Sequence, residues 1–168
     1  MKKTLTKILF LDIDGVLNPR WWERKKPADR FGCAFAPKTI SCLAKIVKET
    51  KAEIVISSSW KLMGLQTLQD MWKERKLPGN IIDITPNYMS DELLLNAGMS
   101  DSDIDSLDIR GIEIKGWLVL HGADVSNYVI IDDMDDILSE QQTHFVQTDP
   151  EVGITNEDVK KVVHLLNN

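Results

Sequence analysis

The sequence has few of the residues that cross-link small proteins or bind transition metals. Its 168 residues include two cysteines and three histidines. Cys33 and Cys42 lie too far apart for a C-x-x-C motif, and neither has a neighbouring histidine. This pattern excludes a disulfide framework and a zinc site, and it favours a protein of the reducing cytoplasm.

Long apolar runs are also missing. No segment approaches the roughly 20 consecutive apolar residues that a membrane-spanning helix needs. The N-terminus starts with lysines and an apolar run at residues 8–11, as a signal peptide does, but Asp12 and Asp14 interrupt the run too early for export. The formal net charge of −6 argues against a general nucleic-acid coat protein. We therefore expect a cytoplasmic protein without a membrane partner.

The sequence does contain enough apolar residues for one core. They make up 43% of the chain, which is typical of a single domain of this length, here residues 1–168. Short apolar runs at residues 8–11, 54–56 and 128–131 each end in acidic or hydroxyl residues. Such runs are typical of strands buried on both faces, and Phe145-Val146 is expected to add another strand.

Apolar residues between these strands recur at helical spacing. The expected helices cover residues 37–47, 65–72 and 110–121 and a final segment from Thr155 onward. Thr155 and Asp158 form a capping-box pattern, and Pro78-Gly79 is expected to stop the second helix. Strands that alternate with helices predict an α/β fold, namely a Rossmann-like three-layer α/β/α sandwich around a central parallel sheet. We expect the first strand to lie between the second and the third.

Two segments depart from this alternation. Residues 19–35 form a short insertion with basic and aromatic character, and residues 90–108 are an excursion with six acidic residues and no basic one. The spacing Asp101-x-Asp103-x-Asp105 is similar to the start of an EF-hand loop, but the glycine and the glutamate that complete such a loop are missing. We interpret the acidic segment as a solvated loop.

Polar side chains gather where the three expected strands end. Asp12 and Asp14 follow the first strand, serines at residues 57–59 follow the second, and Asp132 and Asp133 follow the third. In an open parallel sheet these strand ends share one edge, where ligands bind. Carboxylates that converge there repel one another unless a cation lies between them, and hard oxygen ligands suit Mg²⁺. The alternative is that each acid only caps a helix or turns a loop.

Three segments resemble motifs of the haloacid dehalogenase (HAD) superfamily. Leu11–Asn18 (LDIDGVLN) is similar to motif I, Ile54–Trp60 (IVISSSW) to motif II, and Ile131–Asp136 (IDDMDD) to motif IV. Further phrases are similar to the HAD-like domain associated with Swiss Army Knife RNA-repair proteins: Thr85-Pro86, Arg110–Leu118 and Gly153–Thr155. The resemblance spans most of the chain and implies a HAD-like fold, here without a large cap domain.

This resemblance implies a Mg²⁺-dependent phosphohydrolase that cleaves phosphate monoesters. Asp12 would be the nucleophile and would form an aspartyl-phosphate intermediate. Asp14 would protonate the leaving alcohol and then activate water. Asp12, Asp132 and the Asp14 carbonyl would ligate Mg²⁺, supported through water by Asp133 or Asp136.

The phosphate-binding hydroxyl comes from the run of three serines. We expect Ser58 to serve, while Ser57 or Ser59 stays open because a one-residue slip reverses the face of a strand.

The positive group that balances the phosphate is Arg110 or Lys115. We favour Arg110, which shares a helical face with Ile114 and whose guanidinium can hold two phosphate oxygens. Lys115 has the side chain that is more usual for motif III but lies one position off that face. The alternative role for Arg110 is a surface salt bridge to Glu113 or Asp108.

The insertion at residues 19–35 is too short for a cap domain, so the site is expected to be open to a large substrate. Candidate substrate contacts are Asn18, Arg20, Trp21 and Trp22, which can pair with phosphates or stack on bases. The expected partner is a phosphorylated small molecule or a nucleic-acid end. Alternatively, the tryptophans pack on the insertion itself.

The alternative function is a non-catalytic binding or signalling module on a HAD or receiver-like scaffold. A receiver carries its acidic pair on the first strand and a lone phosphoacceptor on a middle strand. Here the D-x-D-G at residues 12–15 comes first and the acidic pair comes late, which favours the enzyme.

Overall fold

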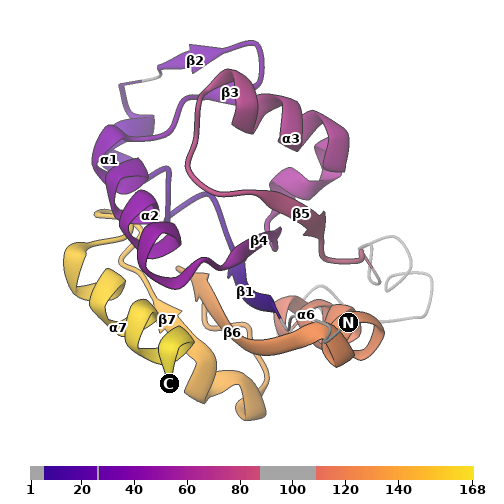
Figure 1. Cartoon of the computed structure of the whole chain (residues 1–168). Coiled ribbons are helices and arrows are strands. Elements are labelled where there is room, and N and C mark those ends of the chain that lie inside the picture. Colours follow the sequence, from indigo (N-terminus) through magenta and orange to yellow (C-terminus); the bar gives the residue numbers. More distant parts are fainter. Residues whose placement is uncertain (1–5, 26, 88–108) are drawn as a thin grey trace, which may run out of the picture.

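A five-stranded parallel sheet forms the centre of the computed structural model, which describes residues 6–25, 27–87 and 109–168 (Figure 1). The strand order is β5-β4-β1-β6-β7, and every neighbouring pair is parallel. The strands are β1 (Thr6–Leu11), β4 (Glu53–Ile56), β5 (Ile81–Ile84), β6 (Val125–Asp132) and β7 (Phe145–Gln147). The predicted position of β1 between β4 and β6 is confirmed, whereas the acidic segment at 90–108 lies outside the described residues.

Helices cover both faces of this sheet and complete the three layers. They are α2 (Pro37–Thr50), α3 (Leu65–Glu74), α6 (Ile109–His121) and α7 (Asn156–Asn167). Leu9 and Leu11 of β1 share a core with α2, α3 and α7, while Ile8 and Phe10 pack against α6 on the opposite face. Because both faces are buried, β1 is apolar without alternation. None of the described helices combines the length and apolarity needed to cross a bilayer.

The local signals at helix ends predict the structure only in part. Thr155 caps α7 by accepting the Asp158 backbone N–H, and the Asp158 carboxylate accepts the Thr155 N–H in return. α3 ends at Glu74, before the Pro78-Gly79 stop indicated by the sequence, because Lys76 takes a left-handed backbone conformation with φ 52°. The sequence analysis also missed β5.

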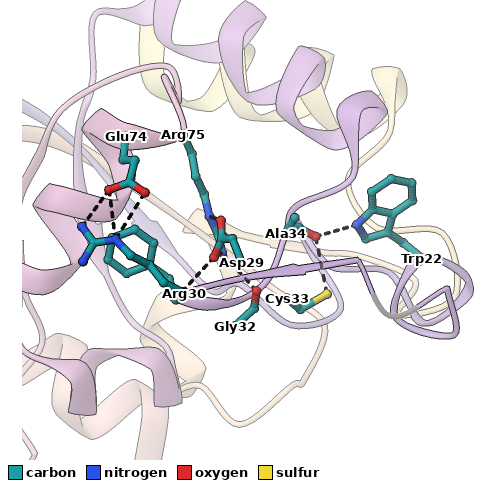
Figure 2. Close-up of polar contacts among 9 residues, drawn as sticks. Trp22, Asp29, Arg30, Gly32, Cys33, Ala34, Glu74 and Arg75 are labelled. Carbon is teal, nitrogen blue, oxygen red and sulfur yellow. Dashed lines mark hydrogen bonds and ion pairs between the residues drawn. The ribbon is translucent and has the colours of Figure 1, made fainter.

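The insertion at residues 19–35 folds into a short helix and a β-hairpin that the sequence did not indicate. α1 (Arg20–Glu23) precedes β2 (Ala28–Asp29) and β3 (Gly32–Cys33), which pair antiparallel. Figure 2 shows two ion pairs, Arg75 with Asp29 and Arg30 with Glu74, that fasten the hairpin to the end of α3.

Candidate active site

Three carboxylates converge at the carboxyl edge of the sheet. The backbone N–H of Asp12 donates to the Ile131 carbonyl at 3.0 Å, which brings the ends of β1 and β6 together. One oxygen each of Asp12, Asp132 and Asp133 lies within 4.8 Å of the others. Asp12 and Asp132 are buried, with exposed fractions of 5% and 1%. Asp12 of the first strand and Asp132 and Asp133 of the third therefore form one cluster, which does not include the Asp14 carboxylate.

Burial makes the ionised state of this cluster costly. It raises the pKa of Asp12 to about 7, although Arg110 partly opposes the shift. It raises the pKa of Asp132 to about 8, and repulsion from Asp12 adds to the effect. Among the described residues, Oδ2 of Asp132 has no hydrogen-bond partner. Nε of Arg110 lies 3.0 Å from this oxygen in an ion pair without a hydrogen bond. A cluster of hard, closely spaced oxygens of this kind is suited to a divalent cation.

Gly15 allows the chain to turn beside this cluster. Its φ is 76°, a left-handed conformation that side chains rarely adopt. A β-carbon at this position would lie 2.5 Å from Cγ of Asp133. Glycine is therefore required both for the turn and for the close approach of Asp133.

Asp14 is held by hydrogen bonds to both of its carboxylate oxygens. Asn18 Nδ2 donates to Oδ1 at 3.2 Å, and the Trp60 indole Nε1 donates to Oδ2 at 2.9 Å. Asn18 is fully buried, so its placement corrects the expectation of a substrate contact. Sequence reasoning did not assign a role to Trp60, although its position directly after the three serines offered a signal.

The three serines take different positions at the end of β4. Ser57 continues the sheet, because its backbone N–H donates to the Leu11 carbonyl at 3.0 Å. Ser58 is fully buried, and its hydroxyl forms a hydrogen bond with Asp12 that lowers the pKa of that carboxyl. Ser59 begins the 3₁₀ helix η1 (Ser59–Met63) and lines the cavity above the carboxylates.

Arg110 is the basic residue that reaches the cluster from α6. Its Nε lies 3.0 Å from Oδ2 of Asp132, and its Nη2 lies 3.7 Å from Oδ1 of Asp12. The alternative of a surface salt bridge is wrong for Glu113, which pairs with Lys61, and Asp108 lies outside the described residues. Lys115 pairs with Glu140 at 2.6 Å, and both of these side chains are 58% exposed. Lys115 therefore does not join the site.

A buried ion pair between η1 and α6 was not expected from the sequence. Lys61 Nζ lies 2.5 Å from Oε2 of Glu113, and it also donates to the Pro86 carbonyl at 3.1 Å. Burial lowers the pKa of Lys61, and the bond to Glu113 opposes that shift. The pair links η1 to the first turns of α6, from which Arg110 projects.

The cluster opens into a cavity of about 260 Å³. Its lining residues are Asp12, Asp14, Gly15, Arg20, Glu23, Ser59, Arg110, Asp133 and Pro150. Arg20 thus lies at the site as expected, while Trp22 donates its indole N–H to the Ala34 carbonyl within the insertion. Trp21 is 36% exposed, and Lys25 Nζ lies 5.0 Å from its ring centroid. Arg20 and Glu23 of α1 therefore border the cavity, while Trp21 and Lys25 lie next to them in the sequence without lining it.

The parallel sheet and the acidic residues at the ends of β1 and β6 are the arrangement expected of a HAD-like protein. Residues 8–159 match the family model described as the HAD domain in Swiss Army Knife RNA repair proteins, and the chain belongs to this family. Comparison with curated proteins gave no match. The family implies a hydrolase-type activity, and the acidic cluster can hold a metal ion.

Proposed function

We propose that the protein is a Mg²⁺-dependent phosphatase that hydrolyses phosphate monoesters through an aspartyl-phosphate on Asp12. The observation that carries this proposal is the joint placement of Asp12, Asp132 and Asp133 with Arg110 beside one cavity. Carboxylates alone would repel a phosphate, so a site that combines them with an arginine and room for a cation suits phosphoryl transfer.

The donor atoms present fit Mg²⁺. The carboxylates of Asp12, Asp132 and Asp133 and the carbonyl of Asp14 would hold it, and the raised pKa values of the two buried acids indicate a cluster that needs positive charge. When bound, the ion supplies positive charge to the phosphoryl oxygens. Oδ2 of Asp132 forms an ion pair with Arg110 but no hydrogen bond among the described residues, so it keeps lone pairs that could bind such a ligand.

The side chains of the site have distinct tasks in the proposed reaction. A carboxylate oxygen of Asp12 attacks phosphorus, and the bond from phosphorus to the leaving oxygen breaks. Asp14 gives its proton to that oxygen and then accepts a proton from the water that attacks the aspartyl-phosphate, which releases phosphate and restores Asp12. Ser59 and Arg110, which line the cavity, hold phosphoryl oxygens, since a hydroxyl and a guanidinium both donate hydrogen bonds. The buried Ser58 hydroxyl, which was expected to bind phosphate, instead bonds Asp12 and supports the nucleophile.

For the substrate we propose a phosphate at the end of an oligonucleotide, with a phosphorylated small molecule as the alternative. The insertion contributes one short helix and a small hairpin, so no domain-sized lid covers the cavity within the described residues. Arg20 lines the cavity, and the exposed Trp21 ring lies nearby in the sequence with Lys25 above it. These groups can bind phosphate and stack on a base. The occurrence of the family in RNA repair proteins supports the same choice.

The test is hydrolysis of p-nitrophenyl phosphate with Mg²⁺ by the wild type and by Asp12→Asn. The amide is nearly isosteric with the carboxylate but is not a nucleophile, so we expect a folded and inactive variant. Brief incubation of the wild type with substrate, followed by acid quench and peptide mass analysis, should find the phosphoryl group on the peptide that contains Asp12. Turnover by Asp12→Asn close to the wild-type rate, in protein free of deamidation, would overturn the covalent mechanism. Binding of phosphorylated oligonucleotides without hydrolysis would favour the non-catalytic module instead.

A further inference from the structure

Trp60 connects Asp14 to an aromatic cluster outside the cavity. Its indole N–H donates to Oδ2 of Asp14 at 2.9 Å, while Asn18 donates to the other oxygen. Two donors on two oxygens define one orientation of a carboxyl group. The indole therefore selects how Asp14 faces the cavity, although Trp60 itself does not line it.

The ring of Trp60 is itself held in place by its neighbours. It packs edge-on against Phe35 with centroids 5.5 Å apart, and Phe35 packs in the same way against Trp72 at 5.8 Å. A β-carbon on Gly32 would lie 3.7 Å from Cη2 of Trp60, so the hairpin backbone passes beside the indole. The acid is thus supported from the hairpin and from α3.

Arg75 joins these two supports. Its guanidinium lies 4.7 Å from the Phe35 ring centroid and 6.0 Å from that of Trp60. It also forms two hydrogen bonds to the Asp29 carboxylate, at 2.7 and 2.8 Å, as Figure 2 shows. The side chain of Arg75 is 8% exposed and that of Asp29 is 37% exposed, so the guanidinium is shielded from water while its carboxylate partner meets solvent. An ordered chain of contacts therefore runs from the hairpin to Asp14.

We propose that Trp60 is a positioning residue for the general acid: its indole N–H fixes the Asp14 carboxyl where it meets the leaving-group oxygen. The inference rests on the proposed phosphatase function and adds the residue that orients the proton donor. Its signature is a dependence on the leaving group. An alkoxide needs a proton as its bond to phosphorus breaks, whereas p-nitrophenolate is stable without one.

The experiment compares Trp60→Phe with the wild type on p-nitrophenyl phosphate and on an alkyl phosphate. The measured quantity is kcat/KM, which reports the transfer of the phosphoryl group to Asp12 rather than the later hydrolysis. General acid catalysis contributes about 10²- to 10⁴-fold, so misplacing the acid should lower kcat/KM for the alkyl phosphate by about tenfold or more. The value for p-nitrophenyl phosphate should change by less than about threefold.

Trp72→Phe is the matched control. Trp72 belongs to the same aromatic cluster, and its indole N–H donates to the Pro78 carbonyl at 2.9 Å, away from Asp14. Any change that Trp72→Phe makes in kcat/KM should be equal for the two substrates. If Trp60→Phe does not fold, replacing Trp60 with 3-benzothienylalanine keeps the bicyclic ring and removes only the N–H.

A second readout is additivity with Asp14→Asn. If Trp60 acts through the acid, adding Trp60→Phe to Asp14→Asn should lower kcat/KM for the alkyl phosphate by less than about twofold. Equal losses on both substrates, or a full additive loss in the double variant, would overturn the positioning role while leaving the phosphatase intact. A wild type that hydrolyses neither substrate would instead refute the proposed function, and the inference with it.

Discussion

Arg110 and Asp132 face each other beside the cavity, with Nε of the guanidinium 3.0 Å from Oδ2 of the carboxylate. They come from the first turn of α6 and the last position of β6. Neither atom has a hydrogen bond within the part of the chain that the structure describes, so the contact is one of charge alone. Arg110 can therefore turn its donors toward an incoming phosphoryl group without breaking a hydrogen bond at Nε.

Removal of this guanidinium should reduce phosphoryl transfer strongly. We expect Arg110→Ala to lower kcat/KM for p-nitrophenyl phosphate by about 100-fold or more, as is typical when a preorganised donor to the transition state is lost. Lys115→Ala, in the exposed pair with Glu140, should stay within about twofold of the wild type because it does not reach the site. Similar losses of kcat/KM in the two variants, with far-UV circular dichroism unchanged, would contradict the assignment of Arg110 as the phosphate-binding cation.

The metal-free protein should lose stability as the pH rises. Asp12 and Asp132 have pKa values of about 7 and about 8 in the folded state, against 3.8 for the ordinary carboxyl. Between about pH 4 and pH 8 the folded state holds protons that the unfolded chain has lost, so unfolding releases protons and stability falls with pH. With EDTA present, we expect the Tm to fall across this window.

Asp132→Asn tests whether ionisation of Asp132 causes the fall in Tm with rising pH, because the amide cannot ionise. The fall in Tm across the window should be smaller in the variant than in the wild type, and Mg²⁺ should raise the alkaline Tm of the wild type only. Calorimetric titration should likewise show Mg²⁺ binding to the wild type but not to Asp132→Ala. Asp135→Ala is the control and should still bind Mg²⁺, because Asp135 is exposed and accepts a hydrogen bond from Gln142. Parallel Tm curves for the wild type and Asp132→Asn would contradict the prediction.

The buried pair of Lys61 and Glu113 should matter for stability. Lys61→Met leaves the Glu113 carboxylate buried without its partner, and breaking a buried pair in this way costs about 3–5 kcal/mol. Urea denaturation should show a loss of this order, and Lys61→Met combined with Glu113→Leu should lose less than Lys61→Met alone. Lys115→Ala, at an exposed pair, should cost less than about 1 kcal/mol. A loss in Lys61→Met as small as that of Lys115→Ala would show that the pair is dispensable.

Trp21 should strengthen the binding of oligonucleotide substrates but not of small ones. Base stacking on an aromatic ring is worth about 1–3 kcal/mol, so Trp21→Ala should raise KM for a phosphorylated oligonucleotide by about fivefold or more at low salt. The KM for a sugar phosphate should not change. Val119→Ala, which alters an exposed apolar residue of α6, serves as the control and should affect neither substrate. Equal use of small and large substrates by the wild type, with no effect of Trp21→Ala, would leave a general phosphatase.

Several features of the protein were predictable from the sequence because they depend on local patterns. A strand covered on both faces must be apolar throughout, so residues 8–11 marked β1 and the two similar runs marked β4 and β6. Parallel strands place their carboxyl ends at one edge of the sheet. The sequence therefore predicted that the acidic residues at those ends lie close together. The capping box of α7 is likewise a signal within four residues.

Tertiary structure decided the contacts between side chains of separate elements. The helical face shared with Ile114 favoured Arg110 over Lys115, but the packing of α6 on the sheet determines that Arg110 reaches Asp132 and that Lys115 pairs with Glu140. The bond between Trp60 and Asp14 joins residues 46 positions apart, and the hairpin that supports it depends on ion pairs with α3. Periodicity and capping act over a few residues, whereas these contacts depend on how separate elements pack, which no local pattern encodes.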